Sequence, residues 1–200
     1  VLGEWDFAVR VGPVDFVDGF SPGVSGAEPL SVFPAIFDAF VRDELGRTYR
    51  FPQGDADRWS VCEVRERDAT GDAQADLLSL RLGANAVATR ADMPHYLEVR
   101  MALGDEDDLQ LAKQVQESLQ AAWEPLEQGI LAFSRVNGDG QLVSGFYVES
   151  PAAAVRQVQA AAQQYAPQLG VDVSTVFDPS WQEYCALYAA IDSQRAGDDA

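Results

Sequence analysis

Residue types that commonly carry catalysis or bind metals are scarce in this chain. His95 is the only histidine, and Cys62 and Cys185 are the only cysteines. A zinc site needs three or four histidine or cysteine ligands, and these three residues are scattered without ligand spacing. A Ser-His-Asp or Cys-His mechanism would have to use His95, but no Gly-x-Ser-x-Gly elbow or comparable nucleophile context is present. A structural role for His95, at the start of a strand behind Pro94, is the favoured interpretation.

The two cysteines also bear on the compartment. They share no Cys-x-x-Cys spacing, and two buried free thiols in a reducing cytosol are favoured over a disulfide between them. No apolar run reaches the roughly 18–20 residues of a membrane span, and no signal peptide is recognisable. We therefore expect a cytoplasmic protein without a membrane segment. The chain begins at Val1 rather than Met, which leaves a cleaved leader as an alternative.

Clustered carboxylates are the second group with possible chemistry. The run Asp105–Asp108 could offer oxygen ligands to a divalent cation, but it lacks the glycine and the spaced glutamate of a calcium-binding loop. Acidic residues at a helix start cap open N–H groups and complement the helix dipole, so we expect a helix start without metal. Asp55, Asp57, Asp68 and Asp72 are likewise expected to be loop acids. Gly138-Asp139-Gly140 lacks the lysine and the following helix of a phosphate loop, so no cofactor is predicted.

The most distinctive string is Asp178-Pro179-Ser180-Trp181-Gln182-Glu183-Tyr184. It is typical of a helix start, with Asp178 as the cap and Pro179 in the first turn. The functional alternative is a recognition patch of aromatic rings and a carboxylate. No catalytic or metal-binding residue is assigned. The candidate binding residues are Tyr147, Asp178, Trp181 and Tyr184.

The charge balance limits the classes of partner. The chain has 32 acidic and 14 basic residues and a net charge of −18. A field of this sign repels nucleic acid and anionic membranes, because binding to phosphates needs a basic patch that releases counterions. High solubility explains such a charge by itself, and a basic protein partner is the functional alternative. The 200 residues are 47% hydrophobic, which is enough to bury a core.

The first 91 residues are predicted to form an α+β half. Trp5, Phe7, Val9 and Val11 alternate along a strand over residues 5–11. Spaced apolar residues predict a helix over 32–45, and two strands are expected over 59–67 and 77–82. Residues 86–90 have no clear pattern.

Residues 95–191 give the stronger pattern. Strand 95–103, a helix from Asp105 to about residue 126, a hairpin of strands 130–136 and 142–149, a second helix after Pro151 and strand 171–177 follow in order. The hairpin turn Asn137–Gly140 contains Asn-Gly and Asp-Gly, which tolerate positive φ. This βαββαβ order predicts an α+β fold with a ferredoxin-like sandwich. A terminal helix is expected to reach Ile191, followed by a frayed acidic tail over 192–200.

Both helices of such a unit cover one sheet face. The residues expected on that face are Leu97, Val99, Met101, Ile130, Ala132, Leu142, Phe146 and Val148. The opposite face is expected to carry Leu131, Phe133, Arg135, Val143 and Tyr147. This second face is too apolar to be solvated, so the N-terminal half should pack on it or extend the sheet. A partner-binding surface is the competing interpretation.

Three motifs also support a family resemblance: strand Tyr96–Leu103, the turn Gly138-Asp139-Gly140 followed by Phe146-Tyr147-Val148, and the ending Asp178-Pro179-x-Trp181-x-x-Tyr184. Through them, residues 96–188 resemble a bacterial family of unknown function related to the RraB-type regulator of ribonuclease E. The resemblance implies a ferredoxin-like fold and, by analogy, an acidic protein that binds and inhibits another protein. The N-terminal half shows no match to that regulator, so neither the ribonuclease target nor any catalytic residue carries over.

These observations favour a non-catalytic, acidic regulatory or inhibitory (immunity-like) domain that binds a basic protein. One alternative is a hydrolase built from scattered carboxylates. Another is a small-ligand module that uses aromatic side chains of the second sheet face. The oligomeric state is left open by the sequence.

Overall fold

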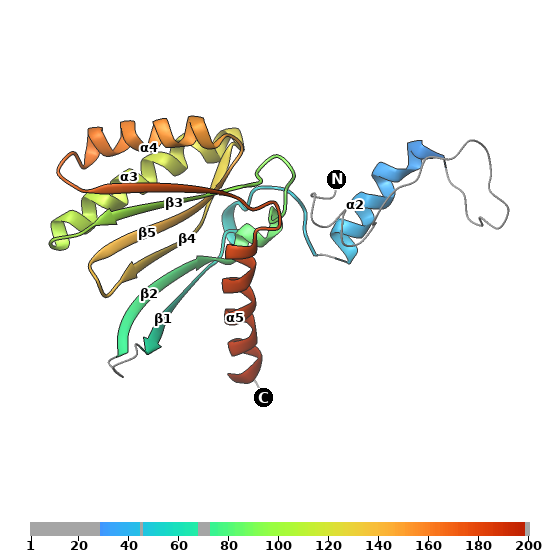
Figure 1. Ribbon diagram of the computed structural model, residues 1–200. Coiled ribbons are helices and arrows are strands. Elements are labelled where there is room, and N and C mark those ends of the chain that lie inside the picture. Colours follow the sequence, from blue (N-terminus) through green and yellow to red (C-terminus); the bar gives the residue numbers. More distant parts are fainter. Residues whose placement is uncertain (1–28, 45, 68–72, 199–200) are drawn as a thin grey trace.

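The computed structural model describes residues 29–44, 46–67 and 73–198 (Figure 1). The strand predicted over residues 5–11 and the loop acids Asp68 and Asp72 lie outside these ranges. Within them the chain mixes helices with one antiparallel sheet, which confirms the α+β prediction.

Six strands form the sheet in the order β1-β2-β4-β5-β3-β6, and every neighbouring pair is antiparallel. The pairing of β2 with β4 makes the first two strands an extension of the sheet built by the C-terminal half. The strands are β1 (Trp59–Arg67), β2 (Ala73–Arg81), β3 (His95–Ala102), β4 (Gly129–Asn137), β5 (Gln141–Val148) and β6 (Val171–Phe177).

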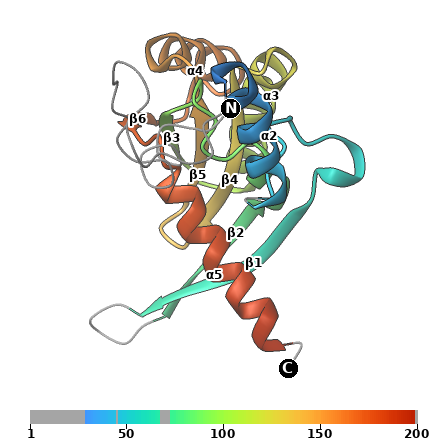
Figure 2. The same ribbon diagram turned by 90° about the vertical axis from the view of Figure 1, so that its right-hand side faces the viewer.

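The described residues contain four α-helices: α2 (Phe33–Asp43), α3 (Glu106–Trp123), α4 (Pro151–Tyr165) and α5 (Gln182–Asp198). α3 and α4 lie side by side over one face of the sheet, and α5 crosses the other face (Figure 1, Figure 2). The segment from Leu82 to Met93 begins with a short 3-10 helix, Leu82–Ala86, and packs on the same face as α5. None of the described helices is long and apolar enough to cross a membrane.

Local signals in the sequence account for the ends of several elements. The Asp105 carboxylate accepts a hydrogen bond from the Asp108 backbone N–H at 3.0 Å, so this acidic run caps α3 as predicted. In the β4–β5 turn, Gly140 has φ +74° and the Asn137 side chain accepts from the Gln141 N–H at 2.9 Å. Such contacts satisfy backbone groups that the chain reversal would leave open.

The last helix differs from the prediction at both ends. α5 begins at Gln182 rather than behind Pro179, and Asp178 reaches it by accepting from the Glu183 N–H at 3.4 Å. The helix also continues to Asp198, beyond the predicted end at Ile191, and Ser193 Oγ donates to the Ala189 carbonyl inside it. The predicted end of the helix at Ile191 is therefore too early.

The face assignment of β4 was wrong at three residues. Leu131 packs under α3 and α4, whereas Ile130 and Ala132 lie on the opposite face with Phe133. The cause is a β-bulge between Leu131 and Phe133, which inserts an extra residue and reverses the alternation for everything before it. An assignment that assumes strict alternation of side chains between the two faces cannot detect a bulge before Phe133.

Candidate protein-binding surface

The four candidate binding residues do come together, but in the core. Tyr147, Trp181 and Tyr184 are completely buried, and Asp178 is 8% exposed. The Tyr147 hydroxyl donates to the Asp178 carboxylate at 2.7 Å, and its ring stacks on that of Trp181 with centroids 3.9 Å apart. These contacts join β5 to the chain just before α5.

Two further hydrogen bonds extend this network to the segment after β2. The Trp181 indole N–H donates to the Met93 carbonyl at 3.0 Å, and the Tyr184 hydroxyl donates to the Arg81 carbonyl at 3.0 Å. Burial raises the pKa of Tyr147, and the hydrogen bond to Asp178 raises it further. Burial likewise raises the pKa of Tyr184. The tyrosines are therefore neutral core residues that position α5, and the four residues form no exposed patch.

The candidate catalytic residues lie on three different elements. His95 begins β3 beside the Phe177 ring, at 5.5 Å between centroids, while Cys62 is on β1 and Cys185 on α5. Neither cysteine is in a disulfide, and both are only partly buried. Within the ranges that the structure describes, no group of three His, Cys, Asp or Glu side chains is arranged to hold a metal.

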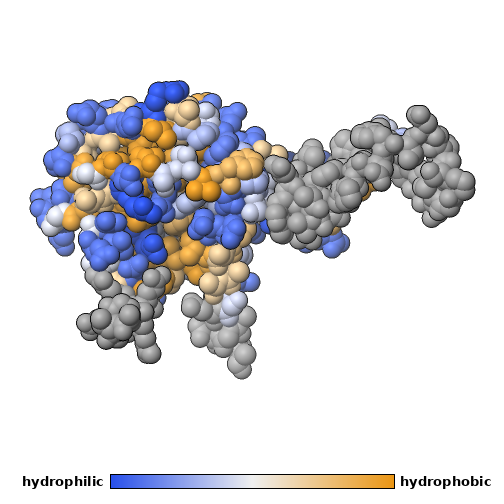
Figure 3. Space-filling view, in the orientation of Figure 1, coloured by the Kyte–Doolittle hydropathy of each residue, from blue (hydrophilic) through white to orange (hydrophobic). Residues whose placement is uncertain are grey.

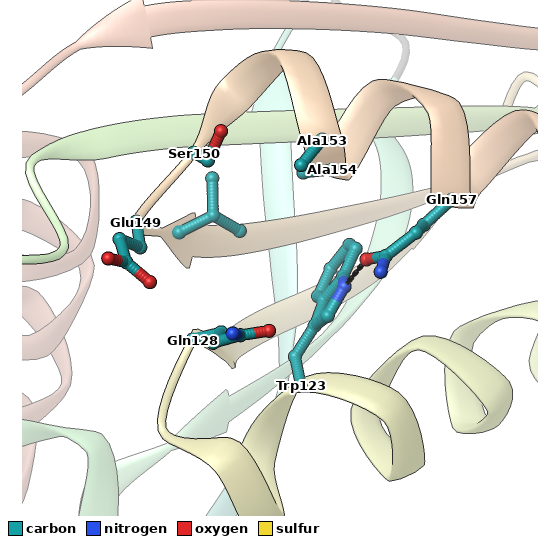
Figure 4. Close-up of a pocket in the computed structure, with 8 residues that line it drawn as sticks. Trp123, Gln128, Glu149, Ser150, Ala153, Ala154 and Gln157 are labelled. Carbon is teal, nitrogen blue, oxygen red and sulfur yellow. Dashed lines mark hydrogen bonds between the residues drawn. The ribbon is translucent and has the colours of Figure 1, made fainter.

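A small cavity lies where the C-terminal end of α3 meets the start of α4 (Figure 4). Its volume is about 80 Å³, well below the roughly 300 Å³ at which pockets for small molecules begin. Trp123 donates its indole N–H to Gln157 across one side, and Glu149 is its only acidic lining residue. Sequence reasoning gave no signal for this cavity, and its size suits a few water molecules rather than a substrate.

One end of the sheet gathers carboxylates from three separate parts of the chain. Two hydrogen bonds assemble it: Leu103 N–H donates to the Gly140 carbonyl at 2.8 Å, and Gly138 N–H donates to the Asp76 carboxylate at 3.0 Å. The β3–α3 loop, the β4–β5 turn and β2 are thereby held together. We call this region the acidic end, and it consists of Asp76, Asp105, Glu106, Asp107, Asp108 and Asp139.

The carboxylates of the acidic end differ in their roles. Asp105 and Asp108 bond to backbone N–H groups of the α3 start, and Asp76 also lies 3.7 Å from Arg135. Glu106 and Asp107 are exposed in the first turn of α3, and Asp139 is exposed in the β4–β5 turn. Like charges on one end of a rigid frame create a negative potential that a cation-rich surface would neutralise. The run Asp105–Asp108 is visible in the sequence, but nothing in the sequence places Asp76 and Asp139 beside it.

Comparison with known proteins adds no relative, since no protein-family model and no curated protein matches the sequence.

Proposed function

We propose that this chain is a non-catalytic, acidic domain of regulatory or inhibitory (immunity-like) type that binds a basic protein through the acidic end. The observation that supports this function is the concentration of six carboxylates from three chain segments on one hydrogen-bonded frame. The net charge of −18 adds a long-range field of the same sign. Such a field accelerates the encounter with a basic partner and makes association sensitive to salt.

The proposal extends to the fold and its relatives. The order β4-β5-β3-β6, with α3 and α4 on one face, supports a ferredoxin-like classification for residues 95–177. A relationship to the RraB-type regulator is part of the same proposal, because that analogy also concerns an acidic protein that inhibits another. The reduced state of Cys62 and Cys185 supports a cytoplasmic location. The cavity of about 80 Å³ beside Trp123 is too small for a substrate, so this cavity supports neither a small-ligand nor a hydrolase function.

The test compares two variants with equal change in net charge. The first is E106Q/D107N/D139N, which removes exposed acidic-end carboxylates that have no capping role. The matched control is D55N/E149Q/D192N, which removes three exposed carboxylates elsewhere. Each variant and the parent chain would be used to capture proteins from cell lysate at about 50 and 500 mM salt, followed by titration of the captured basic protein.

We expect the parent chain to capture a basic protein at low salt and to lose it at high salt. The acidic-end variant should bind at least about tenfold more weakly, and the control variant should bind within about threefold of the parent. Equal weakening in both variants would show that total charge, not this site, governs binding. Capture of no basic protein at low salt would refute the proposed function.

A further inference from the structure

Within the described residues, β6 lies at one edge of the sheet and is paired on one side. Among the described strands it pairs only with β3. The Gly170 carbonyl accepts from Ala102 N–H at 3.0 Å, and Asp178 N–H donates to the Pro94 carbonyl at 2.8 Å, so even-numbered residues point their backbone groups toward β3. Because these groups alternate along an antiparallel strand, the N–H and C=O groups of Val171, Val173, Thr175 and Phe177 point to the free edge.

The two edges of the sheet are protected very differently. Edge strands usually avoid unwanted pairing through charged side chains, proline or bulges. In β1, four of the nine residues are charged. β6 has no proline and a single charge, Asp172, and its Val176 and Phe177 are 55% and 59% exposed. An exposed strand of this kind favours the addition of another strand.

The segment that forms α4 and β6 is unusually poor in charge. From Ser150 to Phe177 only two of 28 residues are charged, Arg156 and Asp172, and their charges cancel, whereas 23% of the whole chain is charged. Depletion of charge is typical of the core of protein interfaces. A neutral surface offers no electrostatic attraction to a basic partner. It is also where two copies of this acidic chain repel each other least. The occupant that fits is therefore another copy of the chain.

The sequence of β6 is also compatible with itself in the antiparallel direction. We propose that the protein forms a two-fold dimer through β6, with Ser174 on the axis. Val171 then lies opposite the second copy's Phe177, and Val173 opposite its Thr175, so all four outward-pointing residues pair. Asp172 lies opposite Val176, so no like charges meet. The two Ser174 residues form a non-hydrogen-bonded pair, in which side chains approach closely.

A groove between α4 and β6 provides space for the second copy's exposed ring. It has a volume of about 470 Å³. Seven of its ten lining residues are apolar, among them Val155, Ala162 and Val171, and the other three are Gln159, Gln163 and Asp172. Figure 3 shows hydrophobic residues gathered between α4 and β6. Paired residues in a sheet project to the same face, so the second copy's Phe177, opposite Val171, would enter this groove. The dimer would thus cover side chains that a single copy leaves exposed.

The experiment is sedimentation velocity on the full chain over about 1–200 µM, with thermal unfolding to confirm that each variant folds. S174K and S174E each place like charges together on the axis and should be monomeric. An equimolar mixture of the two should form dimers again, because the charges then become opposite. V61K is the matched control, since Val61 is 63% exposed on the other edge strand, and it should dimerise like the parent.

The parent dimer should persist at high salt, whereas binding of a basic partner should be lost. A failure of the dimer proposal can therefore be told apart from a failure of the proposed function. A monomeric parent chain at 200 µM would overturn the dimer. Dimers of unchanged affinity in S174K, or a mixture of S174K and S174E that stays monomeric, would overturn this interface. If V61K lost dimerisation to the same extent as S174K, the loss would be a general effect of added charge rather than evidence for pairing through β6.

Discussion

The two faces of the sheet are held by different physical means. The face under α3 and α4 packs mainly through aliphatic and aromatic side chains such as Leu97, Met101 and Phe146. The face under α5 adds a buried polar network, in which Tyr147, Trp181 and Tyr184 each make a hydrogen bond to a distant part of the chain. Apolar packing stabilises the fold according to how completely the side chains fill the core. Buried hydrogen bonds also determine which segments of the chain lie together.

Two tryptophans allow the faces to be compared with the same substitution. Trp181 is enclosed, stacked on Tyr147 and bonded to the Met93 carbonyl, whereas Trp123 borders the small cavity of Figure 4. We expect W181A to lower the free energy of unfolding by about 5 kcal/mol and W123A by about 3 kcal/mol, measured by urea denaturation. The larger loss at Trp181 reflects a carbonyl left without its donor.

The conservative variants refine this test. W181F keeps most of the apolar volume but removes the indole N–H, so it should still cost about 2 kcal/mol, and W123F should cost less because water can reach Gln157. Losses at Trp123 equal to or above those at Trp181 would contradict the distinction between the faces.

Two arginines extend the comparison to ion pairs. Arg81 and Arg90 each bridge two carboxylates, at 2.6–3.0 Å for Asp57 and Glu124 and at 2.6–2.8 Å for Asp92 and Glu127. The Arg81 side chain is 4% exposed, and its carboxylates are 28% and 20% exposed. Asp92 and Glu127 are about half exposed. Burial alone would lower the pKa of Arg81, but hydrogen bonds to both carboxylates raise it, so it stays charged.

We therefore expect R81M to cost about 3 kcal/mol, because two partly buried carboxylates lose their counter-charge. R90M should cost at most about 1 kcal/mol and less still at high salt, since solvent screens the exposed pair. Chemical denaturation at low and high salt measures both. The triple variant R81M/D57N/E124Q should recover part of the lost free energy of unfolding. If R81M lost no more stability than R90M, burial would not be the deciding factor.

The same contrast explains which parts of the fold the sequence could predict. Strand β1, the turn Asn137–Gly140 and the start of α3 depend on neighbours in sequence, and their predicted positions are confirmed. Residues 86–90 have no clear pattern, because distant residues hold this part of the chain. The Ala86 carbonyl accepts from the N–H groups of Thr48 and Tyr49, and the nearby Met93 carbonyl accepts from Trp181. No local pattern encodes such contacts.

The candidate binding residues and the acidic end also depend on contacts between distant parts of the chain. Asp178, Trp181 and Tyr184 have the residue types of a recognition patch, but their types do not reveal that Tyr147 covers them. The acidic end, conversely, depends on Asp76 meeting Gly138, which lies 62 positions further along the chain. No periodic pattern in the sequence links residues so far apart. The pairing of β2 with β4 is what brings Asp76 and Gly138 together.

The smallest expected effect is a difference between the two sheet faces in how stability depends on pH. Y147F removes the donor to Asp178 and should cost about 1–2 kcal/mol at pH 7. S144A, on the face under α3 and α4, removes the bond from Ser144 Oγ to Gln116 and should cost about 1 kcal/mol. The two costs are similar, but only the first involves a group that ionises.

Burial raises the pKa of Tyr96, Tyr147 and Tyr184 above the unfolded value of about 10. Each raised pKa contributes stability that is present below about pH 10 and lost as the pH rises, by about 1.4 kcal/mol per pH unit, because only the unfolded chain then releases the proton. Y147F removes one of these three contributions. Urea denaturation from pH 7 to 11 should therefore show the gap between the parent and Y147F narrowing above pH 10, while the gap for S144A stays constant. Parallel curves for all three proteins would mean that the Tyr147 hydroxyl already meets solvent, and that the network under α5 opens more readily than the core under α3 and α4.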